Sequence, residues 1–238
     1  MSKPTHLPAV VPASGGALTT TPGTQRIATR MADDLLAVAH SRERALAEQR
    51  RYRIGKYEFR EADHEQIQRW ARMLGMGPEA VVEWLEGFRT ETLFDYLGEE
   101  LPHANFRVHD GHIVSLAWDF DKFPLADWAW VNGLKIERLG IVLLDNERWP
   151  TLPCCLRELF CNGCGLHHLD LTPVPGLTYL NCYGNGLPAL DLTPVPGLTS
   201  LVCVSNGLPA LDLTPVPGLT YLNCGHNGLC GLDLTPGP

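Results

Sequence analysis

The sequence feature that most constrains the fold is a 21-residue repeat that begins at Leu156. Its four copies read LRELFCNGCGLHHLDLTPVPG, LTYLNCYGNGLPALDLTPVPG, LTSLVCVSNGLPALDLTPVPG and LTYLNCGHNGLCGLDLTPGP. Apolar residues or cysteine recur at repeat positions 1, 4, 6, 11, 14 and 16. One such unit has too few apolar side chains to offset an ordering entropy of roughly 1 to 2 kcal/mol per residue, so the copies must stack on one another. The period therefore predicts a solenoid.

This spacing resembles the leucine-rich-repeat family in its short bacterial form. The resemblance covers about a third of the chain, from Leu156 onward. It implies an α+β fold class, in which an N-terminal helical cap is followed by a leucine-rich-repeat solenoid with a parallel sheet on its concave face. The alternation of Leu180 and Cys182 with outward-facing residues independently predicts a short strand at positions 3 to 5.

Two further repeat positions predict how the solenoid interior is built. Asparagine at position 9 (Asn185, Asn206, Asn227) is expected to bond backbone groups from a buried side chain. In the first copy Cys164 takes that place, as the family pattern allows. Cysteine at position 6 predicts an inward-facing ladder of reduced thiols, and hence a reducing, cytoplasmic compartment. Its members are Cys161, Cys182, Cys203 and Cys224.

Turn chemistry explains the remaining periodic residues. Aspartate at position 15 is expected to solvate a turn rather than to form a catalytic pair. Because Pro194 and Pro196 lack N–H donors, the stretch from Thr193 to Gly197 is expected to run extended across the convex side. The position-15 residues are Asp170, Asp191, Asp212 and Asp233.

The rest of the chain predicts three more regions before the repeats at 156–238. Residues 1–24 are rich in Ser, Thr and Pro and are expected to be a disordered tail. Residues 25–102 are expected to be helical, and residues 103–155 to hold a hairpin and irregular initial repeats, with Leu139 and Val142 at positions 1 and 4. Asp110-Gly111 predicts the hairpin turn. The expected helices are Thr24–Arg50, Asp63–Leu74, Pro78–Phe88 and Thr90–Leu97.

Composition and motifs argue against several function classes. The net charge of −8 argues against a nucleic-acid partner. The lack of an 18-residue apolar run and of a signal peptide argues against a membrane partner. Hydrolase and phosphate-binding signatures are missing, so we expect no enzyme activity and no cofactor. A zinc site would use the set below, but the repeat pattern already explains Cys161 and Cys164, so no metal is expected. The residues of this alternative zinc site would be Cys154, Cys155, Cys161, Cys164, His167 and His168.

One segment keeps an alternative open. Residues 66–87 have helix-turn-helix spacing, which would make the protein a DNA-binding regulator. The second helix, however, carries Glu79, Glu83 and Glu86, which would repel phosphate. A structural helical hairpin is therefore the favoured interpretation.

The differences between nearly identical repeats predict a binding face. The second and third copies differ at only four of 21 positions, namely 3, 5, 7 and 8. These positions follow the strand and its exit, which points to diversification of the concave face for a protein or peptide partner. The expected binding residues are Glu158, Phe160, Asn162, Tyr179, Asn181, Tyr183, Ser200, Val202, Val204, Ser205, Tyr221, Asn223 and His226.

A second, more distant resemblance is to a class of secreted bacterial proteins. The Leu-Pro-x-x-Leu-x-x-Leu pattern at Leu152 to Leu159 is similar to type III secreted leucine-rich-repeat effectors. That resemblance implies a bacterial effector, exported without a cleaved signal peptide. The ubiquitin-ligase motif of some members has no counterpart here. The last repeat lacks a polar cap, which leaves a frayed end, an end-to-end oligomer and a truncated relative as alternatives.

Overall fold

The computed structural model describes residues 22–87, 106–119, 133–142 and 149–232, and the chain divides into two compact units, 1–47 and 48–238. The first unit is represented by helix α1 (Pro22–Gln49), which matches the expected helix closely. Side chains from Thr29 to Leu46 are all exposed. The expected disordered tail lies outside the described residues, except that residues 22–24 belong to α1.

The second unit begins with a small cap that packs against the first long strand of the solenoid. Two antiparallel strands, β1 (Tyr52–Ile54) and β2 (Tyr57–Phe59), are followed by helices α2 (Glu61–Leu74) and α3 (Pro78–Gly87). Gly75 ends α2 in the left-handed region, with φ 64°. The rings of Trp70 and Trp84 lie 5.0 and 5.4 Å from that of Trp118.

The β1–β2 hairpin lies in the expected helical region 25–102, between Arg50 and Asp63, where the sequence analysis assigned no helix and did not foresee strands. Ile54 and Phe59 are buried while Arg53 and Glu58 are exposed, which is the alternation of a strand rather than of a helix. The two helices expected at Asp63–Leu74 and Pro78–Phe88 are present as α2 and α3. The helix expected at Thr90–Leu97 lies outside the described residues.

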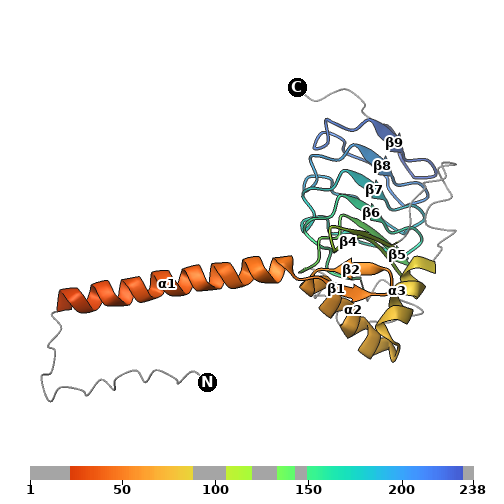
Figure 1. Ribbon diagram of the computed structural model, residues 1–238. Coiled ribbons are helices and arrows are strands. Elements are labelled where there is room, and N and C mark those ends of the chain that lie inside the picture. The colour runs from red at the N-terminus through yellow and green to blue at the C-terminus, as the bar shows by residue number, and fades with distance from the viewer. Residues whose placement is uncertain (1–21, 88–105, 120–132, 143–148, 233–238) are drawn as a thin grey trace, which may run out of the picture. The chain divides into compact units, whose positions relative to one another are not determined.

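The solenoid is built on one seven-stranded sheet with the strand order β3-β4-β5-β6-β7-β8-β9 (Figure 1). Strand β3 pairs antiparallel with β4, and every later pairing is parallel. The β3–β4 turn is formed by Asp110 and Gly111 at φ 47° and 79°, as the sequence predicted. The strands are β3 (Phe106–His109), β4 (His112–Asp119), β5 (Arg138–Val142), β6 (Glu158–Phe160), β7 (Tyr179–Asn181), β8 (Ser200–Val202) and β9 (Tyr221–Asn223).

Strand register corrects the alignment of the irregular initial repeats. Leu139 pairs with Leu159 and therefore occupies position 4, not position 1 as the sequence analysis expected. Arg138 consequently falls on position 3, beside Glu158, and Ile141 on position 6. The two repeats before Leu156 deviate from 21 residues, so a fixed period could not place them correctly.

Stacked side-chain bonds hold adjacent repeats together, and they confirm the predicted role of position 9. The Asn185 amide donates to the carbonyls of Cys161 and Cys182, both at 2.9 Å, and accepts from the Leu166 N–H at 3.0 Å. Asn206 and Asn227 repeat this pattern one and two repeats later. A buried amide thus satisfies backbone groups of two repeats at once.

The predicted cysteine ladder is also present. Cys161, Cys182 and Cys203 are buried, Cys224 is partly buried, and all eight cysteines are free thiols. Burial raises the pKa of the Cys203 thiol to about 12 and raises that of Cys161 well above its ordinary value.

The side of each repeat away from the strands consists of turns. The Asp191 carboxylate accepts the Thr193 N–H at 2.9 Å, and Asp170 and Asp212 do the same in their repeats, as expected for turn residues. The sequence analysis expected the stretch from Thr193 to Gly197 to be extended, and this was wrong: it forms two successive turns. Val195 donates to Leu192 and Leu198 donates to Val195, both at 3.0 Å. Pro194 and Pro196 fit in these turns because the N–H donors are Val195 and Leu198, so no proline N–H is needed.

Candidate functional site

The outward-facing side of the sheet carries a continuous row of side chains at repeat position 3. Strand register brings one residue from each of the seven strands into this row, alternating with the buried leucines of position 4. Charged residues occupy the end near the cap, and tyrosines with serine occupy the other end. From β3 to β9 the row reads Arg107, Ser115, Arg138, Glu158, Tyr179, Ser200 and Tyr221.

The sequence-predicted binding residues divide by exposure. Tyr221 is 44% exposed and His226 is exposed as well. Those that are partly buried still reach the surface; they are Glu158, Asn162, Tyr179, Tyr183, Ser200, Val204, Ser205 and Asn223. Three of the four at position 5 do not, because Phe160, Asn181 and Val202 are only 1%, 2% and 1% exposed. Position 5 was expected to project into a binding surface, but in the first three repeats it is covered, and only Asn223 in the last strand is partly exposed.

Neighbouring side chains explain part of this burial. The Phe160 ring lies between its neighbours in the sheet, 4.9 Å from the Tyr179 ring and 4.9 Å below the Arg138 guanidinium. The Asn181 side chain folds back to accept the Tyr183 N–H at 3.2 Å. The buried residues Phe160 and Asn181 at position 5 therefore support the row at position 3 instead of presenting contacts of their own.

The Tyr179 hydroxyl lies in an unusual environment. Its oxygen is buried and has no hydrogen-bond partner within bonding distance among the residues that the structure describes. Loss of solvent raises the pKa of Tyr179 to about 12, against a smaller opposing effect of the neighbouring Asn181 amide.

The exit from each strand has a fixed backbone conformation at position 8. Gly163 and Gly184 occupy the left-handed region there, with φ 62° and 67°. Ser205 and His226 adopt the same conformation, both at φ 54°. Residues with a Cβ are disfavoured in this region by roughly 1 to 2 kcal/mol, so the two later repeats carry side chains at a position that favours glycine.

A hollow opens at the end of the position-3 row nearest the cap, with a volume of about 310 Å³. Its charged lining includes an ion pair between Arg138 Nε and Glu158 Oε2 at 3.2 Å. The Arg157 guanidinium donates to the Gly176 carbonyl at 3.0 Å. The lining residues are Arg107, His109, Val114, Ser115, Glu137, Arg138, Arg157 and Glu158.

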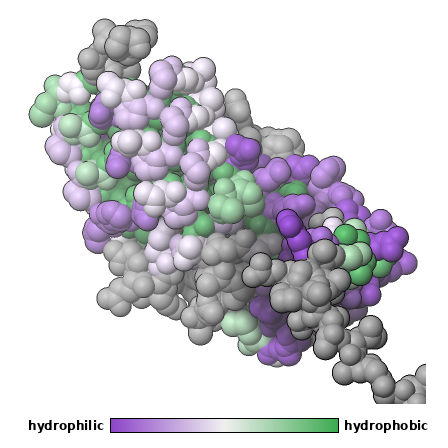
Figure 2. All heavy atoms as spheres, turned by 90° about the vertical axis from the view of Figure 1, so that its left-hand side faces the viewer, coloured by the Kyte–Doolittle hydropathy of each residue, from purple (hydrophilic) through white to green (hydrophobic). Residues whose placement is uncertain are grey.

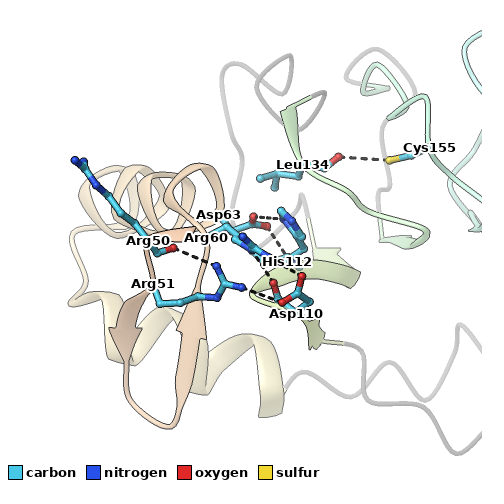
Figure 3. A network of polar contacts seen from close by, with 9 residues as sticks. Arg50, Arg51, Arg60, Asp63, Asp110, His112, Leu134 and Cys155 are labelled. Atoms are coloured by element: carbon cyan, nitrogen blue, oxygen red, sulfur yellow. Dashed lines mark hydrogen bonds and ion pairs between the residues drawn. The ribbon is translucent and has the colours of Figure 1, made fainter. Parts of the chain in front are cut away.

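Residues of the β3–β4 hairpin line one wall of this hollow, and the cap bonds the turn of that hairpin. Figure 3 shows these bonds. Asp110, in the turn, accepts from the guanidinium groups of Arg51 at 2.9 Å and Arg60 at 2.6 Å. Behind the turn, the Asp63 carboxylate bonds His112 Nδ1 at 2.9 Å and the Ile113 N–H at 2.8 Å. These bonds attach the hairpin to the cap at Asp110 in its turn and at the first two residues of β4.

Sequence reasoning missed the hollow, although its residues were all visible. Arg107 and Arg138 lie outside the regular repeats, and the three-residue misalignment of Leu139 removed Arg138 from position 3. The alternation of residues along β4 would have placed Ser115 in the position-3 row, beside Arg138. The signal was the local alternation of the strands rather than the 21-residue period.

The alternative sites of the sequence analysis are placed as follows. Among the described residues, no group of three or more His, Cys, Asp or Glu side chains could hold a metal ion.

The second alternative was a DNA-binding helix at α3. In α3 the apolar residues Val81, Val82 and Leu85 are buried, and Glu79 and Glu83 face solvent. The exposed part of that helix thus presents carboxylates, which disfavours its use for reading DNA.

The repeats carry little charge. Between Leu159 and Leu232 the only Asp, Glu, Lys or Arg residues are Asp170, Asp191 and Asp212. Figure 2 shows one face of the molecule, on which the surface over the repeats is mostly pale, with scattered apolar residues. In the part of the chain that the structure describes, no helix has the length and apolar character needed to cross a membrane.

Comparisons with known proteins give one similar structure. The chain matches no known protein family, and no curated protein matches it. A solved structure that is similar to it is the functional domain of InlJ from Listeria monocytogenes, which includes a cysteine ladder. The sequences are 35% identical, the match covers 45% of this chain and 24% of that chain, and the TM-score is 0.37.

Proposed function

We propose that this protein is a non-enzymatic interaction module that binds a protein or peptide through the outward-facing side of its strands. The observation that carries the proposal is the position of the differences between repeats. The second and third copies are identical except at four positions, and these lie on the strand and at its exit. Solenoids commonly use such an extended surface for recognition, while the unchanged positions maintain the stack.

The accessible residues have the chemistry of a protein interface. Tyr179, Tyr183 and Tyr221 provide large side chains that lose little conformational entropy on binding, and Ser200 and Asn223 provide polar contacts. Charge is nearly absent from this part of the face, as it is from the centres of many interfaces. The buried residues of position 5 support this surface and are not part of the proposed contact set.

Position 8 supports the same proposal from backbone conformation. Glycine is the residue that this left-handed position favours, yet Ser205 and His226 occupy it in the last two repeats. A side chain retained at such a position is a reason to propose a function for it. Both residues lie at the exits of strands β8 and β9.

Site-specific photo-crosslinking tests the proposal. A photoreactive amino acid is placed at Tyr221 on the face, and at Ala210, an exposed residue at position 13, as a matched control. Crosslinked proteins are identified by mass spectrometry, and the affinity of each is measured for the Tyr179→Ala, Tyr221→Ala double variant. We expect a partner crosslinked from position 221 only, with its affinity reduced at least tenfold by the loss of two interface tyrosines.

Two results would contradict this. Crosslinking with equal yield from position 210 would place the partner off the strand face. An unchanged affinity in the double variant, with its circular dichroism spectrum intact, would remove the tyrosines from the interface.

The origin of the partner separates two further proposals. The sequence resemblance to secreted effectors supports a partner from a host cell, whereas a cytoplasmic scaffold would bind a partner from its own cell. Running the crosslinking in both lysates distinguishes them. A partner found only in the host lysate supports the effector proposal, and one found only in the source-cell lysate contradicts it.

A further inference from the structure

The hollow beside the β3–β4 hairpin is formed by a change in side-chain size along the position-3 row. Arg107, Ser115 and Arg138 are paired across three adjacent strands, with the small serine in the middle. Adjacent strands lie about 4.8 Å apart, so the two arginines are separated by about 10 Å across the serine. A space for a small group is thus left between two cationic side chains.

The charges of this hollow are only partly neutralised internally. Arg138 pairs with Glu158, and Arg157 reaches the Gly176 carbonyl. The side chain of Arg107 is exposed and makes no hydrogen bond or ion pair with the residues that the structure describes. None of these residues therefore occupies the guanidinium donors on the wall of the hollow.

The surroundings make this local charge distinctive. The chain has a net charge of −8, and the neighbouring repeats have no Lys or Arg after Arg157. Three arginines and two glutamates line the hollow, which leaves one positive charge in excess when His109 is neutral. The hollow is continuous with the tyrosines of the face through Glu158 and Tyr179, which pair across β6 and β7.

We propose that this hollow binds one carboxylate of an acidic side chain on the protein partner, between Arg107 and Arg138. The proposal rests on the proposed function of the strand face and adds the charge of the partner to it. An excess of one positive charge matches a carboxylate, whereas a phosphate group carries about −1.5 to −2 near neutral pH. Arginine also suits the planar carboxylate, which it can bond through two parallel N–H groups.

Three small probes test the hollow without the partner. The full-length protein, labelled with nitrogen-15, is titrated with acetyl-Gly-Glu-Gly-amide, with the Gln analogue and with inorganic phosphate. The Nε–Hε signals of the arginines are followed by NMR, and the Arg107 signal is assigned from its loss in Arg107→Gln. We expect the Glu peptide to shift this signal in a saturable way and the Gln peptide to leave it unchanged.

Variants locate the binding. Arg107→Gln should weaken binding of the Glu peptide, measured from the shifts of the remaining hollow residues, by about fivefold, as expected for loss of one solvent-accessible ion pair. Arg69→Gln, a change of equal charge at an exposed residue of α2, should leave the affinity unchanged. Equal weakening by both variants would reduce the effect to net charge and overturn the proposal.

The remaining outcomes are equally decisive. The carboxylate proposal would be overturned by equal shifts with the Gln peptide. It would also be overturned if no probe shifted the signal at concentrations up to about 50 mM. Tighter binding of phosphate than of the Glu peptide would reject a carboxylate as the ligand. None of these results bears on crosslinking from position 221, so the two proposals can fail separately.

Discussion

At the scale of single residues, position 8 shows how backbone conformation limits sequence variation. Every repeat needs a left-handed residue at the strand exit, and the first two use glycine there. The sequence comparison interpreted the change from Gly184 to Ser205 as surface variation. The structure adds that this change has a cost in conformational energy, which distinguishes it from variation at an unconstrained surface position.

The Ser205→Gly substitution should therefore stabilise the protein. Relief of left-handed strain contributes about 1 to 2 kcal/mol, and the greater entropy of glycine in the unfolded chain offsets about 0.5 to 1 kcal/mol of this. We expect a net gain of about 0.5 to 1 kcal/mol in the free energy of unfolding, measured by urea denaturation. Ser200→Gly, in strand β8, serves as the control and should destabilise. A loss of stability in Ser205→Gly would show that the serine side chain contributes more than the strain costs.

The cysteines allow a second test at this scale. Cys154 and Cys230 are exposed, whereas Cys161, Cys182 and Cys203 are buried with pKa values raised by burial, that of Cys203 to about 12. Because the thiolate is the reactive species, only the exposed pair should react with iodoacetamide at pH 8 in the folded state. Mass spectrometry of the alkylated protein checks this, with urea-unfolded protein as the control in which all eight react. Modification of Cys182 in the folded state would contradict the ladder.

At the scale of elements, the hairpin turn is held to the cap by charge. The bonds from Arg60 and Arg51 hold the pKa of the Asp110 carboxyl below its ordinary value of 3.8. A carboxyl whose pKa is lower in the folded state stabilises that state when ionised, and this stabilisation is lost as the pH falls through the folded-state pKa. The attachment of the hairpin should therefore weaken only in acid, below about pH 4.

The Asp110→Asn variant isolates this effect. Asparagine also tolerates the left-handed backbone at φ 47°, so the turn itself should persist. We expect the variant to be less stable than the wild type at pH 7 and the difference to shrink as the pH is lowered below 4, measured by thermal unfolding at several pH values. A constant difference between pH 3 and pH 7 would mean that the ion pairs do not stabilise the hairpin.

Elements also show what the sequence could and could not predict. The regular strands, the asparagine and cysteine ladders and the Asp110-Gly111 turn were predictable because each follows from a period or from turn chemistry. The β1–β2 hairpin was missed because its strands have only three residues each, too short for an alternation to stand out. The cationic hollow was missed because the apolar spacing of the repeat was fitted with Leu139 at position 1, three residues from its register in the sheet. The spacings from Ile113 to Ile136 and from Ile136 to Leu156 are 23 and 20 residues, so the 21-residue period could not correct this fit.

At the scale of the whole second unit, burial decreases along the solenoid away from the cap. Leu180 and Leu201 are fully buried at position 4, whereas Leu222 in β9 is only partly buried. Each repeat contacts only its neighbours, so the stability of a strand depends on what is stacked on both sides of it. We therefore expect local opening to begin at β9 and to proceed toward the cap.

Two leucine variants and hydrogen exchange test this gradient. Leu180→Ala should reduce the free energy of unfolding by about 2 to 5 kcal/mol, as for a fully buried leucine. Leu222→Ala should cost about 1 to 2 kcal/mol, because less surface is buried there. Backbone amides should be protected in the order β7, β8, β9, measured by mass spectrometry. Equal costs for the two variants, or stronger protection of β9 than of β7, would contradict a gradient.

The asparagine bonds that join adjacent repeats have a consequence for how this protein can evolve. Each amide bonds its own repeat and the one before it in the same way, so the junction between any two regular repeats is interchangeable with the next. Duplication of one 21-residue block would create no new kind of junction. It would lengthen the strand face by about 4.8 Å and add a fresh set of changeable positions at 3, 7 and 8. Whole repeats are thus units that a gene can gain or lose, which allows the recognition surface to change in length as well as in sequence.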